Sequence, residues 1–213
     1  MLQTPHRVLI GLILVIITVF IVDLITVDSL DALKSVPTNL ETASANLLSG
    51  QGKITDGITL TTLLSAAFLH GDLGHILSNM LFLWVFAGLV GELLGWRWML
   101  GLFIITAICG SIADAILRGG SEIPVVGASG AVLGFEGAYL GLAVRWSLPN
   151  PHIWPIAYPI PPSRLALVAG VGFFLDVSGA VGPATGIAYG AHLGGFLAGL
   201  FLTCFLIPKP KKI

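Results

Sequence analysis

Residues 125–134 read "VVGASGAVLG" and place Ser129 at the start of an apolar run of small residues. Gly130, Gly134 and Ala138 follow at four-residue spacing, so on a helix they lie in one row. Rows of small residues let two membrane helices approach closely. Taken alone, the stretch predicts a packed membrane helix in which Ser129 is one more packing residue. A catalytic serine would need partners elsewhere in the chain.

The composition indicates a membrane protein. The chain of 213 residues is 55% hydrophobic and only 10% charged, with a mean hydropathy of +0.96. Soluble domains carry about 25% charged residues. The net charge of -1 and the lack of a basic face with interleaved aromatics predict no nucleic-acid binding. Cys109 and Cys204 both lie in apolar runs, which argues against a disulfide framework.

Six segments are long and apolar enough to cross a bilayer, which takes about 20 residues. They cover residues 8–27, 73–91, 98–117, 127–146, 164–182 and 187–207. We therefore expect an all-α polytopic membrane protein whose residues 1–213 form a single domain. The first segment is longer than a signal-peptide core, so we expect it to be retained. Residues 28–67 are the one long polar stretch, predicted to be an outer loop.

The distribution of lysine and arginine predicts the orientation. Six spans put both termini on one side, and cationic residues favour the cytoplasm. The side of the termini carries Arg7, Arg97, Arg145, Arg164, Lys209, Lys211 and Lys212. The other side carries Lys34, Lys53 and Arg118. We therefore expect both termini in the cytoplasm, the segment 28–67 outside, and a prokaryotic cell (inner) membrane as the location.

Polar residues recur in the outer half of the predicted spans. The stretch "HGDLGHILSN" at 70–79 puts His75 and Asn79 four apart on one helix face, with His70 at the preceding junction. The stretch "YGAHLGGFLAG" at 189–199 puts His192 within two turns of the outer end of the last helix. Ser129 opens its helix from the same side. Intramembrane polar groups are candidates for function because they are costly to bury.

A second small-residue row predicts how these groups meet. Ala191, Gly195 and Gly199 repeat at four-residue spacing, so the last helix can approach the helix of Ser129 closely. That approach would bring the Ser129 hydroxyl near the His192 ring, and a serine beside an imidazole is an activated nucleophile. His75, Asn79 and the Ser129 backbone N–H could then stabilise an oxyanion.

Other kinds of site match the sequence less well. His70, Asp72 and His75 suggest a metal site, but they lack the i,i+4 histidine pair and the glutamate of a zinc-protease helix. Ser129 also lacks the G-x-S-x-G pattern of soluble hydrolases, because Gly130 follows it directly. We expect no metal and no cofactor.

A transporter or proton pathway is the alternative function. It would use intramembrane acids as a relay, namely Asp23, Asp114, Glu136 and Asp176. Three of these lie near the outer helix ends rather than at staggered depths along one path. Glu136 lies about 10 Å deeper than Ser129 on the same helix face, too deep to orient His192. We expect Glu136 to have a structural or water-holding role.

The combination of "GASG" at 127–130, "HGDLGHILSN" at 70–79 and "AHLGG" at 191–195 resembles the rhomboid intramembrane serine proteases. The resemblance implies a six-helix bundle and a Ser–His dyad without a third carboxylate. Ser129 would be the nucleophile and His192 the general base and acid. His75, Asn79 and the Ser129 N–H would stabilise the oxyanion. The supporting residues would be His70, Gly127, Gly130 and Gly195. The expected partners are transmembrane protein substrates and the lipid bilayer.

Two positions depart from the family pattern. Residues 28–67 contain neither tryptophan nor arginine, where relatives often carry a Trp-Arg pair. Four residues after the nucleophile, many relatives have an aromatic residue that supports the imidazole, and this chain has Leu133. His192 must therefore be held by another group. A non-catalytic rhomboid-like chaperone is a further alternative, although such proteins typically lack the serine or the histidine.

Overall fold

The computed structural model describes residues 4–26, 29–151, 153, 159–182, 187–207 and 209–210. The regular secondary structure of these residues is helical, and they contain no strand beyond one isolated bridge between Ser35 and Val125. The long helices are α1 (Thr4–Thr26), α6 (Trp96–Leu117), α7 (Ser129–Arg145), α8 (Pro162–Ala180) and α9 (Tyr189–Phe201). A further long helix joins α4 (Leu73–Phe82), the π-helical turn η3 (Leu83–Ala87) and α5 (Gly88–Leu94). The π-helical turn η4 (Leu202–Leu206) extends α9.

Five helices are long and apolar enough to cross a membrane: Thr4–Thr26, Leu73–Leu94, Trp96–Leu117, Pro162–Ala180 and Tyr189–Leu206. The chain is an integral membrane protein. The remaining predicted span, 127–146, corresponds to α7, which has 17 residues and is shorter than these five. Most of α7 is buried among the other helices. The six-span count and the orientation of the termini stay predictions.

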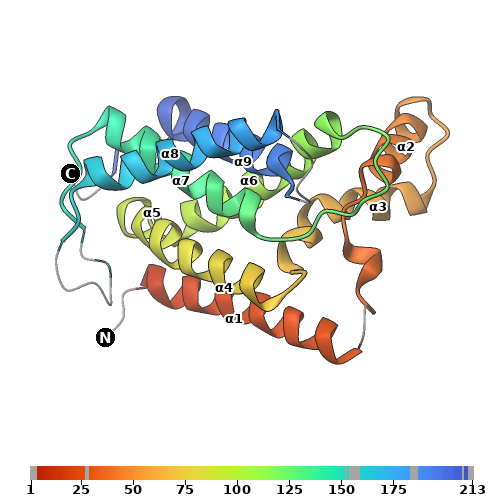
Figure 1. Cartoon of the computed structure of the whole chain (residues 1–213), viewed down its shortest axis with the longest axis horizontal. Coiled ribbons are helices and arrows are strands. Elements are labelled where there is room, and N and C mark those ends of the chain that lie inside the picture. The colour runs from red at the N-terminus through yellow and green to blue at the C-terminus, as the bar shows by residue number, and fades with distance from the viewer. Residues whose placement is uncertain are drawn as a thin grey trace.

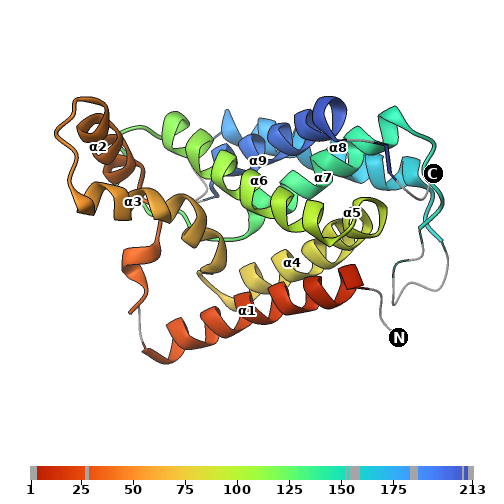
Figure 2. The same ribbon diagram turned by 180° about the vertical axis from the view of Figure 1, so that it is seen from behind.

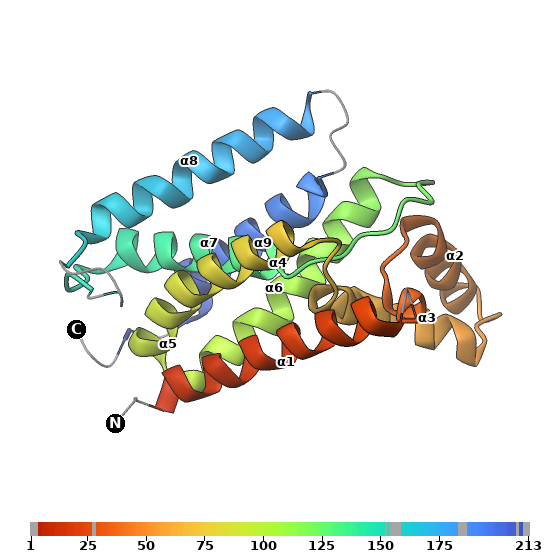
Figure 3. The same ribbon diagram turned by 60° about the horizontal axis from the view of Figure 1, so that its bottom comes forward.

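The helices lie side by side with α1 at one edge and α8 at the other (Figure 3). α1 packs on α5 and α6, whereas α8 contacts α7 and α9. The beginning of α1 and the end of α9 lie at one end of the molecule, and α2 (Pro37–Leu48) and α3 (Ile54–Ser65) lie at the other (Figures 1 and 2). The first residues of α4, α7 and α9 and the last of α8 point toward the end that carries α2 and α3.

Much of the segment 28–67, predicted as a polar outer loop, is helical. It contains η1 (Asp31–Leu33), α2, α3 and the beginning of η2 (Ala66–Phe68). Pro37 begins α2, where a missing N–H costs nothing. The Asp56 carboxylate accepts the Lys53 N–H at 2.8 Å at the start of α3. Asn46 Nδ2 donates to Asp56 Oδ1 at 3.3 Å and thereby joins the two helices.

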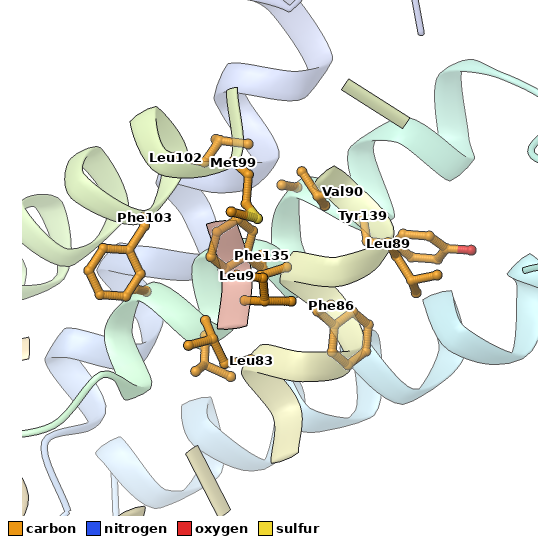
Figure 4. Packing of buried hydrophobic residues seen from close by; sticks show 14 of the residues in the cluster. Leu9, Leu83, Phe86, Leu89, Val90, Met99, Leu102, Phe103, Phe135 and Tyr139 are labelled. Carbon is orange, nitrogen blue, oxygen red and sulfur yellow. The ribbon is translucent and has the colours of Figure 1, made fainter. Parts of the chain in front are cut away.

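A buried apolar core lies between α1, the α4–η3–α5 helix, α6 and α7 (Figure 4). Leu9 of α1 and Phe135 of α7 are both fully buried in it, together with Phe86 and Phe103. This core fixes the position of α7 relative to α4. The two helices that carry Asn79 and Ser129 are therefore held by ordinary apolar packing.

The two small-residue rows meet where α7 crosses α9. A Cβ on Gly195 would overlap the carbonyl oxygen of Gly130, and one on Gly199 would overlap that of Gly134. A Cβ on Gly130 would lie 3.1 Å from the Ala191 carbonyl oxygen. The backbones touch because these positions lack side chains. Ser129 and His192 are thus carried by neighbouring turns of two helices in direct contact.

Candidate active site

The first turn of α4 is fixed by Asp72. Its Oδ1 accepts the His75 N–H at 2.8 Å, an N-cap that satisfies one free donor of the helix. One turn later lies Asn79, which is 5% exposed. Its buried Nδ2 has no hydrogen-bond partner among the described residues. The cap therefore positions the half-buried imidazole of His75 and the unpaired amide donor of Asn79 on one face of α4.

The segment before α7 is held against this face. Gly127 has φ +120°, a conformation that favours glycine, and a Cβ there would lie 2.6 Å from His75 Nε2. The Gly127 N–H donates to the Ala66 carbonyl at 2.9 Å. The next N–H, of Ala128, donates to His70 Nε2 at 3.4 Å. The turn that leads into Ser129 is thus pinned at two successive residues.

His70 is a buried part of this support. Its side chain is only 5% exposed, and its ring lies edge-on to the His75 ring with centroids 5.0 Å apart. Burial, together with the neighbouring His75, lowers the pKa of His70 from 6.5 to about 4. A neutral ring suits its contact with Ala128, because Nε2 must be unprotonated to accept the N–H.

The predicted site residues come together around one cavity of about 840 Å³. Ser129 of α7, His192 of α9, and His75 and Asn79 of α4 all line it. The other lining residues are mainly apolar groups of α7, α8 and the segment before α7. Four groups far apart in sequence therefore face the same space, which offers a hydroxyl, imidazoles and an amide donor to one ligand.

Sequence reasoning missed one contact of this site. His192 Nδ1 lies 2.9 Å from Oδ1 of Asp176, a residue near the end of α8 that also lines the cavity. The two side chains are 16% and 15% exposed. The resemblance implied no third carboxylate. The signal in the sequence was Asp176 itself, an acid near the outer end of a predicted span, as His192 is.

The other three intramembrane acids have no hydrogen bond to His192 among the described residues. Glu136 lines the cavity and is 4% exposed, and a Cβ on Gly172 of α8 would lie 3.4 Å from its Oε2. Asp114 pairs with Arg118 at 2.7 Å. Asp23 accepts the Leu30 N–H at 3.4 Å. In the part of the chain that the structure describes, no three His, Cys, Asp or Glu side chains are grouped as metal ligands.

The fold and the cavity define a class of protein: an integral membrane protein in which a serine and a histidine from two touching helices face one cavity. The family described as "Rhomboid domain" matches residues 58–209. The chain belongs to the rhomboid family. The match includes the predicted site residues Ser129, His192, His75 and Asn79.

Several curated proteins are similar to this chain. RHOMBOID-like protein 5 of Arabidopsis thaliana is 30% identical over 150 residues, 70% of this chain and 45% of that protein. Rhomboid protein 1, mitochondrial, of Saccharomyces cerevisiae is 29% identical over 154 residues, 71% and 43% of the two chains. Rhomboid protease GluP of Bacillus subtilis is 30% identical over 178 residues, 81% and 31%. The matches thus span less than half the length of these relatives.

Proposed function

We propose that the protein is an intramembrane serine endopeptidase that cleaves peptide bonds in or near transmembrane segments of other proteins. The observation that carries the proposal is the shared cavity lined by Ser129, His192, His75 and Asn79. The family supports it, since one relative is named a rhomboid protease. The transmembrane segments of substrates and the surrounding bilayer are the partners that this activity requires.

The proposed reaction uses the groups of the cavity in two half-reactions. Ser129 Oγ attacks the scissile carbonyl carbon while His192 takes the hydroxyl proton. Asn79, His75 and the Ser129 N–H donate to the oxyanion that forms. His192 then gives its proton to the leaving amine, and an acyl-enzyme remains. Water attacks the acyl carbon, His192 takes a proton from that water, and the proton returns to Ser129 as the carboxylic acid leaves.

The arrangement of the acids favours this function over a proton relay. Asp114 pairs with Arg118, and Asp176 hydrogen-bonds to His192. Of the four intramembrane acids, Glu136 and Asp176 line the cavity with the serine and histidine. A non-catalytic chaperone has no need for a serine and a histidine facing one cavity. We propose that six helices span the membrane with both termini in the cytoplasm, so that the cavity opens on the opposite side.

We also propose the prokaryotic cell membrane as the location of the protein. The relatives named above come from a plant, a yeast mitochondrion and a bacterium, so their names do not select one membrane.

The test is the reaction of the purified protein with a fluorophosphonate probe, which reports an activated serine. We expect labelling of the parent chain and none of Ser129→Ala. Equal labelling of both proteins would place the reactive serine elsewhere and contradict the proposal.

A further inference from the structure

The two ring nitrogens of His192 have different surroundings. Nδ1 lies 2.9 Å from Asp176 Oδ1, whereas the ring itself lines the cavity beside Ser129. A carboxylate oxygen accepts hydrogen bonds, so Nδ1 carries the hydrogen in this contact. In the neutral ring, Nε2 is then the nitrogen without a hydrogen, which can accept a proton. The tautomer that this bond selects is the one that a general base needs.

The bond also restricts the orientation of the ring. Both side chains are largely shielded from solvent, with 16% of His192 and 15% of Asp176 exposed, so water competes only weakly for this bond. The Tyr189 ring adds an edge-on contact with centroids 6.2 Å apart. Leu133 occupies the position at which many relatives have an aromatic residue that supports the imidazole. Its aliphatic side chain offers no hydrogen bond to the His192 ring.

We propose that Asp176 is a positioning residue that completes a Ser129–His192–Asp176 triad across α7, α9 and α8. It holds His192 in the tautomer with Nε2 unprotonated and stabilises the positive ring that forms when Ser129 gives up its proton. The inference rests on the proposed function and goes beyond the dyad that the resemblance implied. Asp176 acts on the substrate only through His192.

A structural role is the competing explanation. α8 is weakly anchored, since its described buried residues are Leu165 and Ala169 in its first half, and the bond to His192 joins its other half to α9. A merely structural link would affect melting temperature or substrate binding when removed. A positioning role lowers kcat at nearly constant KM and changes the tautomer of one histidine.

The experiment compares Asp176→Asn and Asp176→Glu with the parent chain in detergent and in vesicles. Asp23→Asn serves as control, because Asp23 is another acid of the predicted spans, is not among the described residues that line this cavity, and accepts the Leu30 N–H instead. We expect Asp176→Asn to lower kcat by up to about 10⁴-fold, the loss seen when the carboxylate of a serine-protease triad is replaced by an amide, with KM changed less than about threefold. Asp176→Glu should recover part of kcat, and Asp23→Asn should keep most of it.

The second readout is nitrogen NMR of ¹⁵N-histidine-labelled protein, with the His192 signals assigned by their loss in His192→Ala. We expect the parent to have Nδ1 protonated and Nε2 unprotonated near neutral pH, and Asp176→Asn to lose this preference. This measurement on the parent keeps the proposal testable even if Asp176→Asn does not fold.

Two outcomes would overturn the proposal. One is Ser129-dependent cleavage with unchanged kcat in folded Asp176→Asn, and the other is a neutral His192 ring in the parent that carries its hydrogen on Nε2 and not on Nδ1. Failure of the proposed function looks different, because the parent chain would then show no Ser129-dependent cleavage, whatever stands at position 176.

Discussion

Asn79 offers the plainest test of the oxyanion site at the scale of single residues. Its buried Nδ2 has no hydrogen-bond partner among the described residues, as expected of a donor that binds the oxyanion only in the transition state. We expect Asn79→Ala to lower kcat by about 10²–10³-fold, the cost of one lost oxyanion donor. Ser78→Ala is the matched control, because Ser78 lines the same cavity while its hydroxyl donates to the His75 carbonyl. Equal rates for the two variants would show that Asn79 serves packing.

We expect His70 to make the fold sensitive to acid. Its pKa falls from 6.5 to about 4 on folding, so between these values the unfolded chain binds more protons than the folded one. Stability should therefore be fully present above pH 6.5 and decrease as the pH falls through about 4, by roughly 3 kcal/mol from this residue. Melting temperatures of the detergent-solubilised protein at pH 7.5 and pH 4.5 measure the loss.

The control for this prediction is His70→Gln. Glutamine does not titrate, and its side-chain oxygen is as far along the side chain as Nε2, so it can accept the Ala128 N–H that His70 accepts at 3.4 Å. The variant should therefore lose less stability on acidification than the parent. If the melting temperatures of both fall by the same amount, another group is responsible for the acid sensitivity.

The contact between α7 and α9 is the element-scale feature on which the site depends. A Cβ on Gly195 would overlap the Gly130 carbonyl oxygen, so Gly195→Ala must push the two helices apart. We expect a loss of at least about 1–3 kcal/mol in stability, together with a lower kcat, because these helices carry Ser129 and His192. Thermal unfolding and cleavage rates in the same detergent measure both effects.

Gly101→Ala in α6 is the control for that substitution, since nothing lies within 4 Å of a Cβ at Gly101. It should change stability by less than about 1 kcal/mol, the difference in helix propensity between glycine and alanine. A Gly195→Ala protein that is as stable and active as Gly101→Ala would mean that the close approach of α7 and α9 is not needed.

The membrane helices were predictable because bilayer thickness sets their length. Each of the six predicted spans overlaps an observed helix, and the segment 98–117 differs from α6 by two residues at its start. The helices α2 and α3 were not predicted. They have 12 residues each, and although Ile54–Phe68 is apolar, it is too short to be predicted as a membrane span. Tertiary contacts such as the bond between Asn46 and Asp56 support them.

Within the site, helix periodicity placed His75 and Asn79 on one face of α4, and the small-residue rows predicted the contact of α7 with α9. The bond between His192 and Asp176 could not be predicted in this way. It depends on the rotation of α8 about its own axis, and α8 has apolar residues on all its faces, of which few are buried. Such a helix gives little sequence signal for the face that it turns inward.

At the scale of the whole molecule, the orientation in the membrane decides which compartment the cavity faces. A cysteine at Lys53, at the start of α3, should react with an impermeant thiol reagent added to intact cells, whereas one at Lys209 should not. Cys109 and Cys204 are partly buried and free, so the parent chain gives the background labelling. The reverse pattern would put the cavity on the cytoplasmic side.

Cleavage of a transmembrane substrate by the purified protein in vesicles tests the central claim most directly. The parent chain should produce two fragments, and Ser129→Ala, His192→Ala and the double variant should each produce almost none. The single losses should nearly equal the double loss, because the two side chains act as one unit. The fold of each variant is checked by its melting temperature. Undiminished cleavage by folded Ser129→Ala would contradict the account.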